Sequence, residues 1–190
     1  MTQDRHLIEE KTASEEILKG HFLHAFRDTV RLPDGGTATR EYIVHPGAVM
    51  MIPLLDDGRL VMERQYRYPM GRVMIEFPAG KIDKGEDVLV CAKRELLEET
   101  GYTAREWVRA GHLNPVISYS TEFIDIWFCR GLELTEAKLD DEEFLEVFTA
   151  TPQQVFDWCR DGTITDSKTL IGALWLQNTL AGTWKLEWQR

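Results

Sequence analysis

The segment that runs into Gly101 constrains the fold of this chain more than any other. Residues 86–100 have the spacing of a helix, and Gly101 suits the left-handed position at which helices end. On such a helix Glu95, Glu98 and Glu99 occupy positions i, i+3 and i+4, so their carboxylates share one face. The other side should pack against a core through its apolar side chains, which are Leu89, Val90, Leu96 and Leu97.

A stripe of like charges has a simple explanation, a solvated helix face, and Lys93 and Arg94 would partly offset the repulsion. The loop before the helix favours a different interpretation. It contains Gly80, at a turn that can expose backbone carbonyl oxygens. Carboxylates on a rigid helix beside such a turn form an oxygen-rich site, which suits Mg²⁺ or Mn²⁺. The segment therefore predicts a divalent-cation site.

The sequence predicts strands before this helix and mainly helices at the end of the chain. Turn residues between apolar runs indicate two hairpins and several shorter strands, at 22–32 with 37–43, 48–55 with 59–66, 73–77, 107–113 and 122–129. Thr151 should cap one helix, and a last helix should start near Asp166 or Ser167. This order is typical of an α/β (α+β mixed) fold, in which helices cover both faces of a mixed sheet.

The composition limits the partners of the chain. Its formal net charge is -10 and its pI is near 5.0, whereas affinity for nucleic acid comes mainly from Lys and Arg contacts to phosphates. Hydrophobic residues make up 43% of the 190 residues, which argues against wholesale disorder. The charge therefore excludes a polyanion-binding surface. It leaves small phosphorylated substrates open, because a bound cation can reverse the local sign.

The three cysteines, Cys91, Cys129 and Cys159, are far apart, and no pair or Cys/His cluster indicates a zinc site or a disulfide framework. The charged N-terminal residues lack an apolar signal-peptide core, and the longest apolar stretch, 46–55, is far short of the ~20 residues that span a bilayer. We therefore expect a soluble, cytoplasmic protein that binds no membrane.

The segment 80–102 resembles the Nudix box: Gly80, five residues, Glu86, seven residues, and then RELLEETGY at 94–102. The resemblance implies a Nudix-like α/β/α sandwich and hydrolysis of a nucleoside diphosphate linked to another moiety, with Mg²⁺ (or Mn²⁺) as cofactor. It implies that Arg94 orients the carboxylates through a salt bridge that includes Glu86. The implied metal ligands are the carbonyl of Ala79 and the carboxylates of Glu95, Glu98 and Glu99, and Glu98 and Arg94 are also implied to be catalytic.

Four flanking stretches are similar to the ADP-ribose pyrophosphatase branch of that family: REYIV at 40–44, ERQYRYP at 63–69, EFPAG at 76–80 and GTITDSKT at 162–169. The similarity implies substrate-binding roles for Arg40, Arg67, Glu76 and Glu122. The loop at 114–122 departs from the family pattern, because it lacks the glycine of a Ser-Pro-Gly segment. Glu122 nevertheless falls where the loop glutamate of the family would stand.

The acidic run 139–146 is either a solvated loop or, by the resemblance, the loop that supplies the general base. Glu142 is the first candidate for that base, ahead of Glu143 and Asp141. Residues 1–43 are expected to form an N-terminal β-hairpin region used for homodimerisation, and 44–190 the Nudix hydrolase domain.

The leading hypothesis is hydrolysis of ADP-ribose to AMP and ribose 5-phosphate. The alternatives are hydrolysis of GDP-mannose or a UDP-sugar, and a non-catalytic sensor that binds ADP-ribose. Long RNA is a poor ligand for a chain with a formal net charge of -10.

Overall fold

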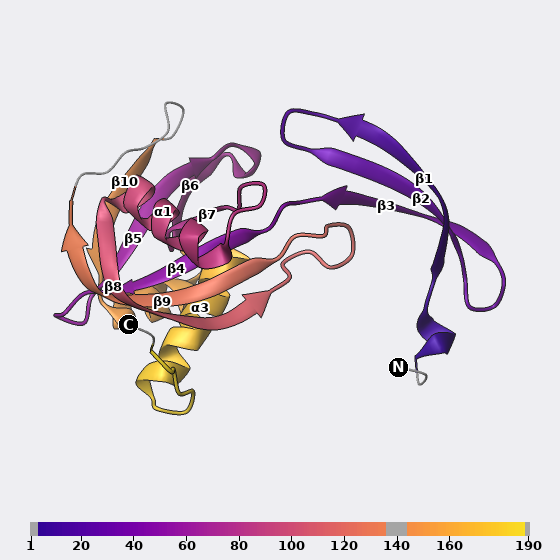
Figure 1. The fold of residues 1–190 in the computed structure, drawn as a ribbon. Coiled ribbons are helices and arrows are strands. Elements are labelled where there is room, and N and C mark those ends of the chain that lie inside the picture. Colours follow the sequence, from indigo (N-terminus) through magenta and orange to yellow (C-terminus); the bar gives the residue numbers. More distant parts are fainter. Residues whose placement is uncertain (1–3, 136–143, 189–190) are drawn as a thin grey trace. The chain divides into compact units, whose positions relative to one another are not determined.

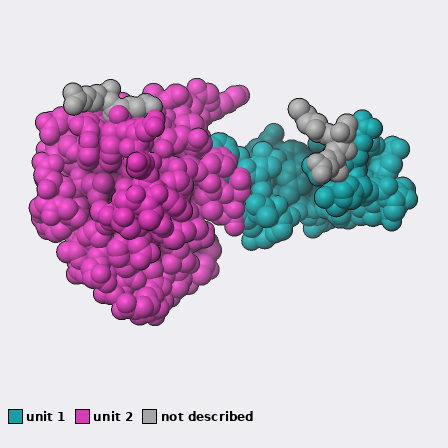
Figure 2. Space-filling model, turned by 90° about the horizontal axis from the view of Figure 1, so that it is seen from below, with its two compact units in different colours: residues 1–47, 116–123 teal, residues 48–115, 124–190 magenta. Residues whose placement is uncertain are grey.

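The computed structural model of the chain describes residues 4–135 and 144–188. It divides into two compact units, which Figure 2 shows in different colours. Unit 1 comprises Met1–Gly47 and Val116–Phe123, and unit 2 comprises Ala48–Pro115 and Ile124–Arg190. Each unit is described by itself.

Unit 1 contains a short 3-10 helix, η1 (Arg5–Leu7), and a three-stranded antiparallel sheet in the order β1 (Glu10–Lys19), β2 (His24–Arg31), β3 (Thr37–Val44). The predicted hairpin is confirmed as β2 and β3, whose turn places Gly35 at a φ of 88°. The sequence did not predict β1. Every residue of β1 is exposed, so it lacks the alternation of apolar and polar residues that marks a half-buried strand.

Unit 2 is built on a mixed seven-stranded sheet. Its strands follow the order β10-β5-β4-β9-β8, with β6 paired to β5 and β7 paired to β4. Only β4 and β9 pair in parallel among the strands described. A 3-10 turn, η2 (Tyr68–Met70), precedes β6. The strands are β4 (Ala48–Leu54), β5 (Leu60–Arg67), β6 (Arg72–Glu76), β7 (Ala79–Lys81), β8 (Tyr102–Leu113), β9 (Ile124–Leu134) and β10 (Leu145–Ala150).

Helices cover both faces of this sheet, as the sequence predicted. The helix α1 (Val88–Thr100) lies on one face, and α3 (Ser167–Leu180) lies on the other (Figure 1). The helix α2 (Pro152–Asp161) packs against α3. The main apolar core lies on the α3 side, where alternate residues of β4 meet the helix. Within the described part of the chain, no helix is long and apolar enough to cross a membrane.

The helix α1 ends at Gly101 as predicted, but it begins at Val88 and not at the predicted Glu86. Asp87 caps it by accepting hydrogen bonds from the backbone N–H of Leu89 (2.9 Å) and Val90 (3.2 Å), and Gly101 ends it in the left-handed region, at a φ of 73°. The expected inner face is partly wrong. Val90 is 56% exposed, whereas Glu99 is only 3% exposed. The helix is rotated so that its buried stripe consists of Cys91, Ala92, Leu96, Glu99 and Thr100.

Candidate active site

Arg94 lies among three carboxylates. Its guanidinium binds Glu86 through two hydrogen bonds, Nε to Oε1 and Nη2 to Oε2, each 2.9 Å long. Its Nη1 donates to Glu95 Oε1 (2.9 Å) and to Glu98 Oε2 (2.8 Å). Nη2 also reaches the carbonyl oxygen of Lys81 at 3.2 Å. One cation thus fixes carboxylates from the loop and from the helix, and the ion pair expected between Arg94 and Glu86 is present.

The strand β7 lies directly beneath the glutamates of α1. A methyl group at Gly80 would overlap the carboxylate of Glu95, so only glycine leaves room for that carboxylate here. The neighbouring Ala79 donates its backbone N–H to Glu99 Oε2 at 3.1 Å, which brings a buried carboxylate next to this short strand. The turn and the helix that the sequence paired are therefore in contact.

A second charged cluster surrounds Glu76, which is 2% exposed. Arg67 donates two hydrogen bonds to its carboxylate, from Nε at 2.8 Å and from Nη2 at 2.9 Å. Lys168, at the start of α3, forms an ion pair with the same carboxylate and another with Asp166 at 3.0 Å. The sequence assigned no role to Lys168. Only its place in the stretch 162–169 could have signalled one.

The same end of α3 also holds the backbone that leads to the box. Asp166 caps the helix and accepts a hydrogen bond from the hydroxyl of Thr169 (2.7 Å). That hydroxyl oxygen in turn accepts a hydrogen bond from the backbone N–H of Phe77 at 3.3 Å. Residues Phe77 to Gly80 are consequently held at one end by α3 and at the other by α1.

Ion pairing sets the charge states of both clusters. The Arg94 guanidinium lowers the pKa of Glu86 to about 2, so Glu86 stays ionised at neutral pH. Burial alone would raise the pKa of Glu76, but Arg67 and Lys168 together hold it below its ordinary value. The thiol of Cys91 has a pKa raised to about 12 by burial and by Glu86, so it is protonated and no nucleophile at neutral pH.

A family comparison identifies this arrangement. The sequence pattern of the NUDIX domain matches residues 44–170. The chain belongs to the Nudix family. It is a Nudix hydrolase, and a second pattern, the nucleoside diphosphate sugar hydrolase N-terminal domain, matches its residues 9–43.

Two relatives resemble this Nudix hydrolase over most of their length. The methanol dehydrogenase activator of Bacillus methanolicus is 39% identical over 176 residues, covering 90% of this chain and 94% of that protein. The ADP-ribose pyrophosphatase of Bacillus subtilis (strain 168) is 35% identical over 173 residues, with the same coverage of 90% and 94%. The crystal structure of an ADP compounds hydrolase shares the fold, with a TM-score of 0.83, 22% identity, and coverage of 92% of this chain and 95% of that one.

The donor groups of this Nudix hydrolase suit a hard divalent cation. Glu95 and Glu98 share one hydrogen-bond donor in Arg94, and Glu99 accepts a hydrogen bond from the backbone N–H of Ala79. Carboxylate oxygens are the ligands that such a cation prefers. Across residues 4–135 and 144–188, no three acidic, histidine or cysteine side chains are already arranged so that they could hold a metal ion. Glu95 and Glu98 are turned toward Arg94, and a cation would compete with it for them.

The remaining predicted residues belong to unit 1 or lie outside the described residues. Arg40 is in β3 of unit 1, where its guanidinium pairs with Glu9. Glu122 is also in unit 1, and its carboxylate lies 3.9 Å from Nε2 of His45. Glu142, the candidate base, lies outside the described residues, as do Asp141 and Glu143. The structure therefore brings together the box residues, and separately Arg67 with Glu76.

Proposed function

We propose that this Nudix hydrolase cleaves ADP-ribose to AMP and ribose 5-phosphate with Mg²⁺ (or Mn²⁺) as cofactor. The observation that carries the proposal is the set of Glu95, Glu98 and Glu99 on one helix against the strand of Ala79 and Gly80. The similarity to the Bacillus subtilis ADP-ribose pyrophosphatase supports the choice of substrate.

The roles follow from the chemistry of a pyrophosphate, whose negative charge repels an attacking oxygen. Mg²⁺ bound by Glu95, Glu98, Glu99 and the carbonyl of Ala79 would neutralise phosphate oxygens and lower the pKa of a water molecule. Arg94 keeps the carboxylates in place through its hydrogen bonds. Glu142 is proposed to accept the proton of the water that adds to one phosphorus, while the other phosphate leaves with its sugar.

Arg67 is proposed to bind a substrate phosphate, together with Arg40, Glu76 and Glu122 around the rest of the molecule. Its side chain is 38% exposed although it is paired with the buried Glu76. Lys168 also pairs with Glu76, so that carboxylate stays neutralised when Arg67 turns toward a phosphate. Without Lys168, the same movement would leave a buried charge with no counter-ion, which is costly.

The substitution Glu99→Gln tests the proposal. The amide oxygen can still accept the hydrogen bond from Ala79, so the fold should be retained, but a metal-binding charge is lost. We expect turnover of ADP-ribose to fall by at least ~100-fold, the scale of losing one preorganised electrostatic contact. Glu133→Gln, on the exposed end of β9, is the matched control. Wild-type turnover by Glu99→Gln at saturating Mg²⁺ would show that the mechanism is wrong.

Another nucleotide sugar is the alternative substrate, either GDP-mannose or a UDP-sugar. Competition of ADP-ribose with GDP-mannose and a UDP-sugar in one reaction, with Mg²⁺ and with Mn²⁺ and with the AMP, GMP and UMP products separated, decides between them. A preference for either sugar nucleotide over ADP-ribose would replace the proposed substrate while leaving the box chemistry in place. Calorimetry that shows ADP-ribose bound but not consumed with Mg²⁺ would instead favour a sensor.

The similarity to the methanol dehydrogenase activator favours a second candidate function, action on a dehydrogenase. We would add the chain with Mg²⁺ to a methanol dehydrogenase and follow its rate. Repeating the assay with Glu99→Gln separates activation that needs hydrolysis from activation by binding alone. An unchanged dehydrogenase rate with the wild-type chain would remove this candidate.

We further propose a homodimer assembled through the N-terminal region 1–43, with the hydrolase domain spanning 44–190. Unit 1 supports it by exposing apolar side chains on and beside β1 that a partner would cover, namely Ile17, Leu18 and Phe22. Sedimentation at micromolar concentration should give a species of twice 22.0 kDa. A 22.0 kDa species would contradict the dimer. The cytoplasmic location stays a prediction.

A further inference from the structure

A buried carboxylate lies in the same row of the sheet as the glycine beneath Glu95. Asp125 of β9 is 4% exposed and is paired with Val49 of β4 on one side and with His112 of β8 on the other. Val49 in turn is paired with Gly80 of β7. Directly paired residues point to the same face of a sheet, so this row crosses four strands on the face that carries α1.

A β-bulge gives Asp125 two neighbouring nitrogen-bearing side chains. Arg109 and His112 are three residues apart on β8, and a regular strand would point them to opposite faces. The pairing register shifts between Arg109 and Gly111, which inserts one extra residue and restores both side chains to one face. Arg109 forms an ion pair with Asp125 through Nε, and His112 Nδ1 lies 3.5 Å from the other carboxylate oxygen.

The opposite face of the sheet holds the bulge in place. A methyl group at Gly111 would come within 2.7 Å of the indole ring of Trp175 on α3. Trp175 is itself packed against Trp184, with ring centroids 4.3 Å apart. The bulged backbone therefore lies tight against α3, and glycine is the residue that allows this approach.

The cluster is a polar surface that can both donate and accept hydrogen bonds. The side chains of Arg109 and His112 are 54% and 42% exposed, while that of Asp125, which joins them, is 6% exposed. Asp125 balances the charge of Arg109, so the cluster has no excess positive charge for a further phosphate. Donors beside an acceptor match hydroxyl groups, each of which donates one hydrogen bond and accepts others.

The row also places the cluster at a defined distance from the box. Neighbouring strands lie ~4.8 Å apart, so Asp125 is about 10 Å along the row from the glycine that Glu95 covers. If the box glutamates hold the pyrophosphate, the sugar attached to its outer phosphate would lie at about this distance, beside Asp125. We propose that Arg109, Asp125 and His112 form the subsite for this hydroxyl-rich group. The proposal rests on the proposed pyrophosphatase function.

The test compares two substrates that differ in this group, ADP-ribose and the methyl ester of ADP, in wild type and in Arg109→Gln. We expect kcat/KM for ADP-ribose to fall about 10- to 100-fold, the worth of one hydrogen bond to a charged group, mainly through KM. The value for the methyl ester should not change. Asp125→Asn should also lower kcat/KM for ADP-ribose more than for the methyl ester, because it removes the charge that holds Arg109 in place.

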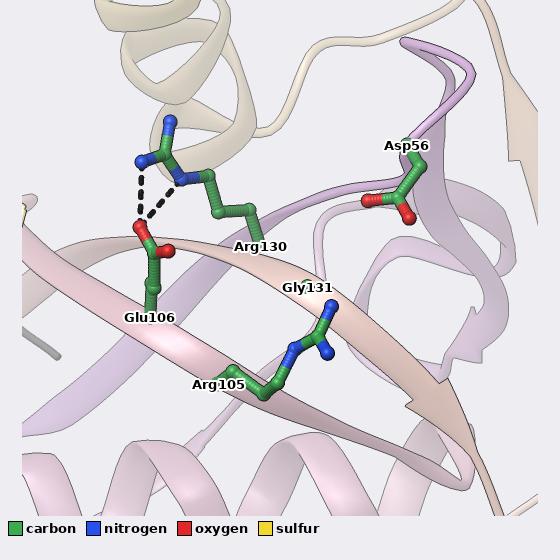
Figure 3. Close-up of a pocket in the computed structure, with 5 residues that line it drawn as sticks. All are labelled: Asp56, Arg105, Glu106, Arg130 and Gly131. Atoms are coloured by element: carbon green, nitrogen blue, oxygen red, sulfur yellow. Dashed lines mark hydrogen bonds and ion pairs between the residues drawn. The ribbon is translucent and has the colours of Figure 1, made fainter.

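Arg105→Gln is the matched control. Arg105 is the other arginine of β8, 69% exposed and paired with Glu133. It lines a separate pocket with Asp56, Glu106, Arg130 and Gly131, in which Arg130 is tied to Glu106 (Figure 3). This substitution should leave kcat/KM unchanged for both substrates.

Equal losses on both substrates with Arg109→Gln, or no loss on either, would overturn the subsite. Failure of the proposed function would show itself differently, as no hydrolysis of either compound by the wild-type chain. In that case calorimetry with ADP-ribose and Mg²⁺ still tests the subsite. Wild type should then bind about 10- to 100-fold more tightly than Arg109→Gln, by the same hydrogen-bond reasoning, and equal affinity would overturn it.

Discussion

Replacing Gly80 with alanine separates the site from the stability of the fold. Gly80 has no positive φ, so its backbone accepts alanine without strain. The three heavy atoms nearest to the added methyl group all belong to the carboxylate at the far end of the Glu95 side chain. Glu95 can swing away because its end is flexible, but it then leaves the position from which it would bind a cation.

The size of the effect follows from this overlap. The methyl carbon would lie 1.9 Å from the carboxylate carbon of Glu95, whereas non-bonded carbon atoms prefer separations of ~3.5–4.0 Å, so the carboxylate must move by about 2 Å. A displacement of that size in a catalytic arrangement costs about 100-fold in rate. The stability loss should be near the low end of overpacking, about 1 kcal/mol, which lowers Tm by about 2–4 °C for a chain of this size.

The assay is ADP-ribose turnover at saturating Mg²⁺, together with thermal unfolding, for Gly80→Ala, Glu95→Ala and the double variant. Gly36→Ala, at a turn glycine in unit 1 without positive φ, is the control. Removing the Glu95 carboxylate removes the overlap, so Gly80→Ala should cost little further stability in the Glu95→Ala background. Wild-type turnover by Gly80→Ala, or a Tm loss that persists in that background, would refute the reasoning.

Three further predictions use other parts of unit 2. Because Arg94 lowers the pKa of Glu86 from 4.5 to about 2, this pair stabilises the fold fully above pH 4.5 and loses its effect as pH falls toward 2. As pH falls over this range, the Tm measured by thermal unfolding should therefore decrease less for Glu86→Gln than for wild type. Gly172→Ala places a methyl group 2.7 Å from Met50 and 3.0 Å from Phe77, so urea unfolding should show a loss of about 1–3 kcal/mol. Mg²⁺ at 100 times its Kd should stabilise wild type by about 2.7 kcal/mol, and a calorimetric Tm unchanged by Mg²⁺ would contradict the metal site.

Local chemistry explains which elements could be predicted. The bounds of α1 depend on Asp87 and Gly101, and those of α2 on Thr151, whose side chain and Gln154 form a reciprocal cap. Hairpin β2–β3 depends on a turn of Pro, Asp and Gly residues. Each of these signals lies within a few residues of the feature that it fixes, so the sequence alone is sufficient.

Features set by distant partners could not be predicted. Lys168 and Glu76 are separated by 92 positions and meet only because α3 packs on the sheet. The bulge at Arg109 to Gly111 is visible only in the pairing of β8 with β9. Strand β1 has no apolar face of its own, and its pairing to β2 includes cross-strand ion pairs such as that of Lys11 with Asp28 at 3.5 Å.

The burial of Glu99 shows why a shared helix face does not mean a shared environment. Glu95, Glu98 and Glu99 point to one side of α1, but only the last of them is buried, and the backbone N–H of Ala79 donates a hydrogen bond to it. The first two keep contact with Arg94 and with solvent. The carboxylates therefore differ in what holds them: a backbone amide fixes Glu99, and an exchangeable cation fixes Glu95 and Glu98. An arriving Mg²⁺ would meet one rigid ligand and two that can turn from Arg94, which remains bound to Glu86 at its other edge.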